Sequence, residues 1–487
     1  MSVADFAPLS LELAVAGLAI VVLLLDAIFL PKRAKALGWV TLGGLAGVLL
    51  VSFVGDPQGS IAQGAYELTA SALFFKRVFL VAGMLGTLGA IDYLSERAPR
   101  RQSEYYVLLL SSITGMMMLP CTRDLLLLVV AFELMGMPLY LMAAWMKTDG
   151  QKGTESAKPV AEGALKLYMV GAASTAITLF GVALVVGLGG ATRLADLAST
   201  INSPLATLGV LLALAGMGFK IGLVPFHMWV PDTYQGSMTP FVAFLSVAPK
   251  AAGLAAISVL ASLAPPGSSS FWAHALMGLA ALSMLIGNLL ALPQTDVRRL
   301  LAYSGVAQMG YAVLALAADT PLSHAALLFY IASYVFTNMG TFFVVHAVAE
   351  SEGSHDLSAL AGLTRRSPWL SFALLLFLLS LAGIPFVVGF WAKLYVFWAA
   401  YQAGLLWLVA FGALLAVVAL FYYMQVARAA YMVEPQGEIT PLRAKATIQV
   451  AIAICVLAVV GIGLWPSALL DPAIDATHPT VPTTLPQ

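Results

Sequence analysis

The feature that most constrains this chain is a lysine placed beside helix-breaking residues inside a long apolar segment. The stretch GMGFKIGLVPFHMWVPDTYQGSMTP, from Gly216 to Pro240, contains Lys220 and follows it closely with two glycines and three prolines. An ammonium group at bilayer depth costs at least ~2.5 kcal/mol, and a proline removes a backbone donor that lipid cannot replace. The sequence therefore predicts a helix that breaks beside a polar cavity, with Lys220 lining that cavity.

The composition indicates a membrane protein with no redox centre of its own. The chain has 487 residues, of which 61% are hydrophobic and 10% are charged, and its mean hydropathy is +0.92. A soluble chain of this length needs more charge to cover its surface, and a formal net charge of zero argues against a nucleic-acid partner. Cys121 and Cys455 are isolated, so we expect no cofactor and no metal site on this chain.

Hydropathy predicts fourteen membrane-spanning segments, and therefore an all-α polytopic membrane protein. Interruptions are predicted in the seventh and twelfth spans, where glycine and proline accompany a lysine. An even number of spans places both termini on the same side of the membrane. In chain order, the predicted spans are 9–30, 36–54, 70–94, 104–120, 123–146, 160–188, 205–232, 238–262, 272–292, 300–318, 322–349, 367–401, 404–433 and 443–465.

The basic residues predict the orientation of these spans. Of the 24 lysines and arginines, sixteen fall on one side and four (Lys76, Arg77, Arg123 and Arg193) on the other. The positive-inside rule assigns the richer side to the cytoplasm, which places both termini outside. The sixteen are Lys32, Arg33, Lys35, Arg97, Arg100, Arg101, Lys147, Lys152, Lys158, Arg298, Arg299, Arg365, Arg366, Arg428, Arg443 and Lys445.

The four remaining basic residues all lie within predicted spans, and all are lysines. Arginine stays charged almost anywhere, whereas a buried lysine can release its proton near neutral pH. A row of buried lysines is therefore a candidate proton relay. The four are Lys166, Lys220, Lys250 and Lys393.

Two pairs of segments indicate an internal repeat. Met118–Tyr140 parallels Ala291–Tyr311 through a Leu-Pro-x-Thr start, a nearby Asp and a Met-Gly, and Lys220–Phe226 is echoed by Gly383–Lys393. The matching spans are the fifth and tenth and the seventh and twelfth, so the copies must cross the membrane in opposite directions, as in many transporters. We divide the chain into an N-terminal segment (1–103), a first repeat (104–265), a second inverted repeat (266–433) and a last helix with its tail (434–487).

Glu133 is the predicted partner of Lys220. It lies about ten residues into the fifth span, roughly 15 Å deep, where a carboxylate must be paired, protonated or hydrated. We expect Glu133 to face the Lys220 cavity and to control whether Lys220 holds its proton. The alternative is a static ion pair that only joins two helices.

The other candidates extend this path in both directions. Lys250 follows Pro249 deep in the eighth span and is predicted to pass protons between the halves, while Lys393 follows the Gly383 break and would be the proton site of the second half. Lys166 lies near the cytoplasmic end, where a proton-input role and a snorkelling side chain are both open. His227 could extend a hydrated path or be a core histidine that is hydrogen-bonded to the backbone. Asp232 is interpreted as a helix cap.

Four segments resemble a known family of membrane proteins. They are FKIGLVPFHMWVPDTYQGSMTPFVAFLSVAPKAAG (Phe219 to Gly253), AFELMGMPLYLM, QTDVRRLLAYSGVAQMGY and SLAGIPFVVGFWAKLYVF. Together they resemble the antiporter-like membrane subunits of respiratory complex I and of the Mrp-type cation/proton antiporters. The resemblance covers most of the chain from about Tyr105 to Tyr431.

The resemblance implies a fold and a set of site residues. It implies fourteen helices with two inverted five-helix repeats, helices 4–8 and 9–13, and breaks in helices 7 and 12. It also implies a glutamate and a lysine in the fifth and seventh helices, a linking lysine in the eighth and a terminal one in the twelfth, positions that Glu133, Lys220, Lys250 and Lys393 match. A lysine in the twelfth helix disfavours the subunit M branch. The lysine in the eighth, with no long lateral helix after the last span, disfavours subunit L, so the pattern is most like the subunit N branch.

The same resemblance implies the activity and the partners. It implies a proton-translocating subunit in the membrane arm of NADH:quinone oxidoreductase, in a bacterial inner membrane with both termini on the periplasmic side. NADH, FMN, iron–sulfur clusters and quinone would belong to the whole complex, and the partners would be other antiporter-like and small membrane subunits together with the lipid bilayer. The alternatives are a subunit of an Mrp-type sodium/proton antiporter and a scaffold subunit that conducts nothing.

Overall fold

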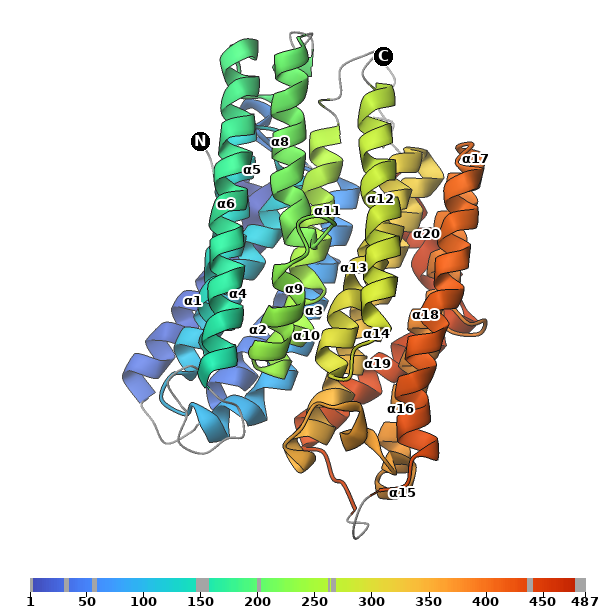
Figure 1. Cartoon of the computed structure of the whole chain (residues 1–487). Helices are drawn as coiled ribbons and strands as arrows, with labels where there is room; N and C mark the ends of the chain where they lie inside the picture. The colour runs from blue at the N-terminus through green and yellow to red at the C-terminus, as the bar shows by residue number, and fades with distance from the viewer. Residues whose placement is uncertain are drawn as a thin grey trace.

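Long apolar helices run side by side through the whole bundle (Figure 1). The computed structural model describes residues 3–29, 35–54, 59–145, 157–198, 203–261, 263, 269–435 and 441–477. Lys32, Arg33, Lys147 and Lys152, which contributed to the predicted orientation, lie outside these ranges, as do both chain ends. The expected all-α fold is confirmed apart from one small antiparallel hairpin of β1 (Gly59–Ile61) and β2 (Tyr66–Leu68).

The helices follow the predicted spans closely. The first part of the chain contains η1 (Val3–Leu9), α1 (Ser10–Phe29), α2 (Ala36–Val51), η2 (Ala62–Gly64), α3 (Ala70–Arg97), α4 (Gln102–Met118), η3 (Leu119–Cys121), α5 (Leu125–Ala143), α6 (Ala157–Gly189) and α7 (Leu194–Ala198). The middle contains α8 (Pro204–Ile221), α9 (Trp229–Gly236), α10 (Thr239–Leu245), α11 (Ala248–Ala261), α12 (Ser269–Ala291), α13 (Val297–Ala318) and α14 (Pro321–Glu352). The last part contains η5 (Leu357–Leu360), α15 (Leu363–Arg366), α16 (Pro368–Ala382), α17 (Val388–Gln402), α18 (Leu406–Met432), α19 (Ala446–Leu464) and α20 (Ser467–Asp475).

Twelve helical segments of the described residues are long and apolar enough to cross a membrane. Two more, α2 and α16, are apolar but shorter. All fourteen predicted ranges coincide with a helix or an interrupted helix, because the apolar windows are long and are separated by charged or glycine-rich loops. Fourteen actual crossings stay a prediction.

The predicted breaks in the seventh and twelfth spans are present and have the same local structure. α8 ends at Gly222 (φ 77°), whose N–H bonds to the carbonyls of Gly218 and Phe219, and the chain becomes helical again only at α9. α16 ends at Gly383 (φ 86°), whose N–H bonds to Leu379 and Ser380, and α17 follows. Both glycines adopt the left-handed conformation that a helix end of this type requires and that other residues adopt at a cost.

A third interruption, which the sequence analysis did not predict, divides the eighth span. α10 and α11 are separated by a turn at Ser246 and Val247. Pro249 has no N–H for the carbonyl four residues before it, which explains why the helix is not continuous here. Asn338 of α14 donates a hydrogen bond to the Ser246 hydroxyl at 2.7 Å, so a polar side chain contacts the interruption. Lys250 is the third residue of α11.

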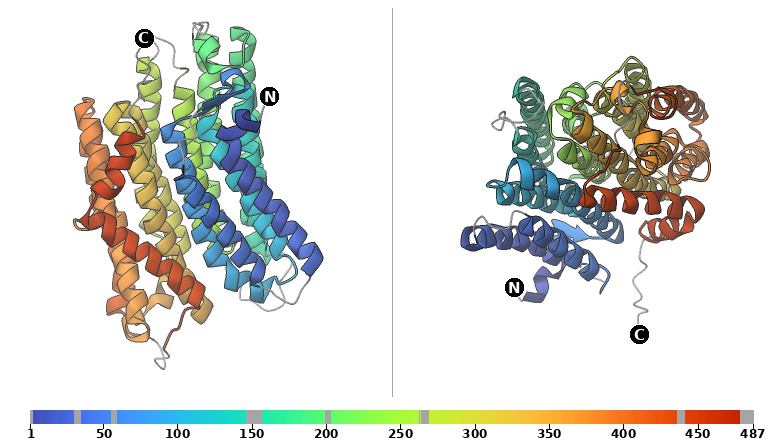
Figure 2. Two further views of the ribbon diagram at one scale, coloured as in Figure 1. Left: turned by 180° about the vertical axis from the view of Figure 1, so that it is seen from behind. Right: turned by 90° about the horizontal axis from the view of Figure 1, so that it is seen from below.

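The first helices and α19 together cover one side of the bundle. α1, α2 and α3 form a layer along that side, and α19 crosses the bundle obliquely to reach it (Figure 2). At its start, Lys445 pairs with Glu96 of α3 and Glu350 of α14, at 2.6 and 3.1 Å. At its end, the Gly463 carbonyl accepts a hydrogen bond from Trp391 at 2.8 Å, and Gly463 lies against the backbone of the break after Gly383. α19 therefore joins the first layer to the second broken helix.

Candidate functional site

Lys220 is buried in the last turn of α8, immediately before the Gly222 break. Its side chain is 4% exposed, and Nζ donates a hydrogen bond to the Tyr140 hydroxyl of α5 at 2.8 Å. Nζ also lies 4.5 Å from the ring centroid of Tyr140 and 5.2 Å from that of Phe132. Aromatic faces attract a cation and exclude water, so α5 supplies an aromatic site for the Lys220 ammonium.

Glu133 faces the same region, but it does not form a direct ion pair with Lys220 among the described residues. Its carboxylate accepts a hydrogen bond from Thr175 of α6 at 2.6 Å. Glu133 and Tyr140 are seven residues apart on α5, so they lie on one face of that helix. The Lys220 ammonium is thus bonded to the neutral Tyr140 hydroxyl, and the charged Glu133 lies two helical turns from Tyr140 on α5. The Tyr140 contact was not predicted from the sequence, since a tyrosine in a span is most often packing.

Lys250 is completely buried where α9, α11, α13 and α14 meet. Its Nζ lies 5.6 Å from the Tyr234 ring centroid. A methyl group added to Gly305 would touch both Lys250 Nζ and the Tyr334 hydroxyl, so these two groups gather at one point of α13. Among the described residues, Lys250 Nζ and the hydroxyls of Tyr234 and Tyr334 have no hydrogen-bond partner. Buried polar groups are normally hydrogen-bonded, so these three groups have unused hydrogen-bonding capacity.

Lys393 lies in α17 and reaches back across the second break. Its Nζ donates hydrogen bonds to the carbonyls of Leu381 and Ala382, at 2.8 and 3.0 Å, in the last turn of α16. These carbonyls are at the negative end of the helix dipole, which favours a cation. Lys220 precedes its glycine by two residues and Lys393 follows its glycine by ten, yet both ammonium groups lie at the end of the helix that breaks.

Neutral polar side chains lie between Lys250 and Lys393. Gln308 of α13 donates to the Leu381 carbonyl at 3.0 Å and to the Tyr423 hydroxyl at 3.1 Å, and it accepts a hydrogen bond from Tyr330. Gln308 and Lys393 also line a cavity of about 20 Å³, which has room for about one water molecule. Gln308 was not predicted from the sequence. Its position in the repeated segment AQMGY was the available signal.

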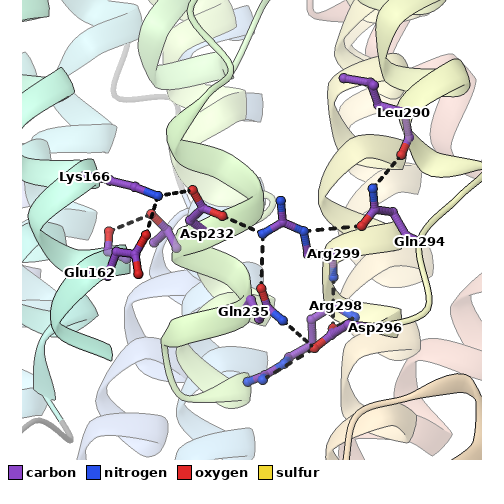
Figure 3. Close-up of polar contacts among 11 residues, drawn as sticks. Glu162, Lys166, Asp232, Gln235, Leu290, Gln294, Asp296, Arg298 and Arg299 are labelled. Atoms are coloured by element: carbon purple, nitrogen blue, oxygen red, sulfur yellow. Dashed lines mark hydrogen bonds and ion pairs between the residues drawn. The ribbon is translucent and has the colours of Figure 1, made fainter. Parts of the chain in front are cut away.

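Lys166 is at the surface and joins three helices through Asp232 (Figure 3). Its side chain is 43% exposed, and Nζ pairs with Glu162 of α6 and with Asp232 of α9, each at 2.6 Å. The other Asp232 oxygen pairs with Arg299 of α13 at 2.5 Å. The interpretation of Asp232 as a helix cap is wrong, because α9 begins after Met228 with no side-chain cap and Asp232 is used in ion pairs.

The Asp232 pairs are expected to persist at neutral pH and to be lost in acid. Partial burial opposes ionisation, but hydrogen bonds from Lys166 and Arg299 outweigh it, and the pKa of Asp232 lies below its ordinary value. The stability that these pairs add is therefore present above about pH 4 and falls as the pH drops further. Asp232→Asn is expected to lower stability by about 1 kcal/mol at pH 7 and to remove this acid-dependent part of thermal unfolding. Identical unfolding of the two proteins from pH 8 to pH 3 would show that the pairs contribute nothing.

His227 lies in the break between α8 and α9. It is partly buried, its ring centroid is 6.4 Å from that of Tyr303, and Nδ1 has no hydrogen-bond partner among the described side chains. The structure therefore places His227 next to the Gly222 break but does not connect it to Lys220 by a hydrogen bond.

Lys76 of α3 is a fourth buried lysine among the described residues, beside Lys220, Lys250 and Lys393, although the count of basic residues assigned it to the outer side of the membrane. It lies in the second turn of α3 with no exposed surface and pairs with Glu12 of α1 at 2.8 Å. The Tyr66 hydroxyl donates to Glu12 at 2.5 Å and accepts from Lys76 at 2.9 Å. This cluster lies in the first layer of helices. Its two charges are paired with each other, although Glu12 Oε2 has no hydrogen-bond partner among the described residues, and we interpret the cluster as a structural junction.

Comparison with known proteins gives consistent relatives. Residues 122–419 match the family model described as NADH:quinone oxidoreductase/Mrp antiporter, TM. The chain is 37% identical to NADH-quinone oxidoreductase subunit N of Moorella thermoacetica over 472 residues, which is 96% of this chain and 97% of that protein. It is also 37% identical to NAD(P)H-quinone oxidoreductase subunit 2 of Trichodesmium erythraeum, over 86% of this chain and 80% of that protein.

Solved structures of membrane complexes contain chains with the same fold. A chain of respiratory complex I from Thermus thermophilus with bound aureothin superimposes with a TM-score of 0.80 at 33% identity, covering 95% of this chain and 98% of that one. A chain of the Mrp complex from Dietzia sp. DQ12-45-1b gives a TM-score of 0.85 at 20% identity, covering 98% and 97%. At that lower identity the likeness concerns the fold alone.

Proposed function

Because the chain belongs to the NADH:quinone oxidoreductase/Mrp antiporter transmembrane family, we propose that it is a proton-translocating subunit in the membrane arm of an NADH:quinone oxidoreductase. The observation that carries the proposal is that Lys220, Lys250 and Lys393 are buried in the helix bundle and have no ion-pair partner among the described residues. An unpaired ammonium in such a place is costly. Each lysine can therefore alternate between a charged and a neutral state.

The proposed path begins at the Glu133/Lys220 pair and ends at Lys393. The Glu133 carboxylate stabilises the Lys220 ammonium more strongly than the neutral Tyr140 hydroxyl does. Movement of Lys220 toward Glu133 therefore favours proton uptake, and movement toward Tyr140 favours proton release. Lys250 receives the proton, and Gln308 with its neighbours connects Lys250 to the second break. Lys393 releases it on the other side. Lys166 and His227 would flank the beginning of the path. The energy would come from redox chemistry in partner subunits, which would carry NADH, FMN, iron–sulfur clusters and quinone.

The proposed architecture is fourteen crossings with two inverted repeats, helices 4–8 and 9–13. Two local similarities support it. Asp124 caps α5 and Asp296 caps α13, and each aspartate accepts hydrogen bonds from the backbone N–H groups two and three residues after it. In each case the next residue's N–H bonds to the loop after the following long helix, at Thr192 and His355 respectively. With the Gly222 and Gly383 breaks, these similarities favour the division 1–103, 104–265, 266–433 and 434–487. We place the chain in a bacterial inner membrane with both termini on the periplasmic side, which the distribution of the basic residues favours.

An Mrp-type sodium/proton antiporter subunit is the second candidate, because the matching family model also covers the Mrp antiporters. The test is to purify the chain with its native partners and reconstitute the complex into vesicles. Acidification of the lumen on addition of NADH and quinone, independent of sodium, is the expected result. Sodium-dependent proton flux without quinone turnover, or copurification without flavin and iron–sulfur subunits, would overturn the proposal. A scaffold subunit would assemble but leave pumping unchanged when its lysines are replaced.

A further inference from the structure

Two glycines in helix interiors have no conformational reason to be glycine. Gly136 lies in α5 and Gly305 in α13, and neither is at a helix end or has a positive φ. Glycine inside a helix costs roughly 0.5–1 kcal/mol relative to alanine. Something other than the backbone must therefore favour glycine at these two positions.

At both glycines, the ammonium group of a buried lysine lies where a side chain would begin. A methyl group on Gly136 would collide with Lys220 Nζ, and one on Gly305 would lie 2.7 Å from Lys250 Nζ. Among the described glycines, these are the two whose nearest atom is an ammonium nitrogen. At other described glycines a methyl group would first meet an apolar side chain, as at Gly83, backbone, as at Gly115, or a hydroxyl group, as at Gly171 and Gly216, or it would meet nothing within 4 Å, as at Gly278.

On α5 the glycine separates the two partners of Lys220. Glu133 lies three residues before Gly136 and Tyr140 four residues after it, so all three share one helix face. The Lys220 ammonium rests over Gly136 while it donates to Tyr140. Because Gly136 has no Cβ, it places no side-chain atom of its own between the hydroxyl and the carboxylate. Any larger residue would stand between them.

We propose that Gly136 and Gly305 are positioning residues that seat the relay lysines. Each seat lets an ammonium lie directly against a helix backbone, and the Gly136 seat lets Lys220 move between Tyr140 and Glu133. The inference rests on the proposed function, because it assigns the seats to a relay. Gly383 also lies against Lys393, but its φ of 86° requires glycine in any case, so that position cannot be tested separately.

Alanine variants of the assembled complex test the seats. The atom displaced is the end of a flexible side chain, so Gly136→Ala and Gly305→Ala are expected to assemble and to move the ammonium without disturbing the helices. We expect each to cause at least half of the loss in proton-to-electron ratio caused by Lys220→Ala, measured in reconstituted vesicles. Gly278→Ala makes the same change in α12 where no atom lies within 4 Å, and it should pump like the unmodified complex.

A double variant separates a seat from a purely structural role. Because Gly136 acts through Lys220, Gly136→Ala is expected to add no further loss in a Lys220→Ala background. An additive loss would overturn the seat on α5. If Lys220→Ala lowers the ratio while both glycine variants match Gly278→Ala, the seats are wrong and the relay stands. If Lys220→Ala itself changes nothing, the proposed function fails. If Gly136→Ala does not assemble, the same comparison is made with Gly305→Ala in a Lys250→Ala background. An additive loss there would overturn the seat on α13.

Discussion

Lys220→Ala is expected to slow proton transfer through this chain by roughly seventyfold, while the complex still assembles and oxidises NADH. Without the lysine, a proton has no basic group beside the Gly222 break. An unpaired charge at that depth costs at least ~2.5 kcal/mol, which corresponds to a rate factor of this size. The measurement is lumenal acidification per electron in vesicles that contain the purified complex.

A charge-conserving variant makes the same test more specific. Lys220→Arg keeps the cation but does not release its proton, so it should pump as poorly as Lys220→Ala. A lysine that served only as a fixed positive charge would instead be replaced by arginine with pumping retained. Lys158→Ala is the matched control, because Lys158 is an exposed lysine at the start of α6. An unchanged proton-to-electron ratio in the Lys220 variants would refute the relay.

The second large effect concerns stability and the buried Glu12/Lys76 pair. Lys76→Ala and Glu12→Ala are each expected to destabilise the folded chain by about 3–5 kcal/mol, because each leaves an uncompensated buried charge. Replacing both, as in Glu12→Leu with Lys76→Met, should recover most of that loss. Thermal unfolding of the purified complex in one detergent measures all three.

An exposed ion pair with a similar N–O distance is the control for the effect of burial. Glu162 and Lys166 form an ion pair at 2.6 Å, but their side chains are 63% and 43% exposed, whereas Lys76 has no exposure. Glu162→Ala is therefore expected to cost at most about 1 kcal/mol. Equal effects of Glu162→Ala and Lys76→Ala would mean that burial does not determine the contribution of the Glu12 pair.

Sequence reasoning placed the helices and two of the three interruptions. Apolar windows of about 20 residues are a strong signal, and glycine beside proline marks the Gly222 and Gly383 breaks. The interruption before Pro249 has a weaker signal, since a single proline in an apolar helix is often tolerated when neighbours satisfy the freed carbonyl. The β1–β2 hairpin consists of three-residue strands, which are too short for periodicity to reveal.

The candidate site was predictable in its lysines but not in its partners. Lys220, Lys250 and Lys393 are conspicuous because a cation in an apolar span is costly. Their neighbours Tyr140 and Gln308 are not, because neutral polar residues in spans are usually packing contacts. Asp232 and Lys76 were misplaced for a related reason: the window that finds a span does not say which side chains meet across it. Those contacts depend on how the helices pack.

The position of α19 has a mechanical consequence. This helix lies outside both proposed repeats, yet Gly463 near its end contacts the break after Gly383, while Lys445 and Thr447 at its start bond to α3 through Glu96 and Asp92. A displacement of the second break must therefore either move α19 as a rigid body or strain its polar contacts with the first layer. The contacts between α19 and α3 would then limit how far the second broken helix can move.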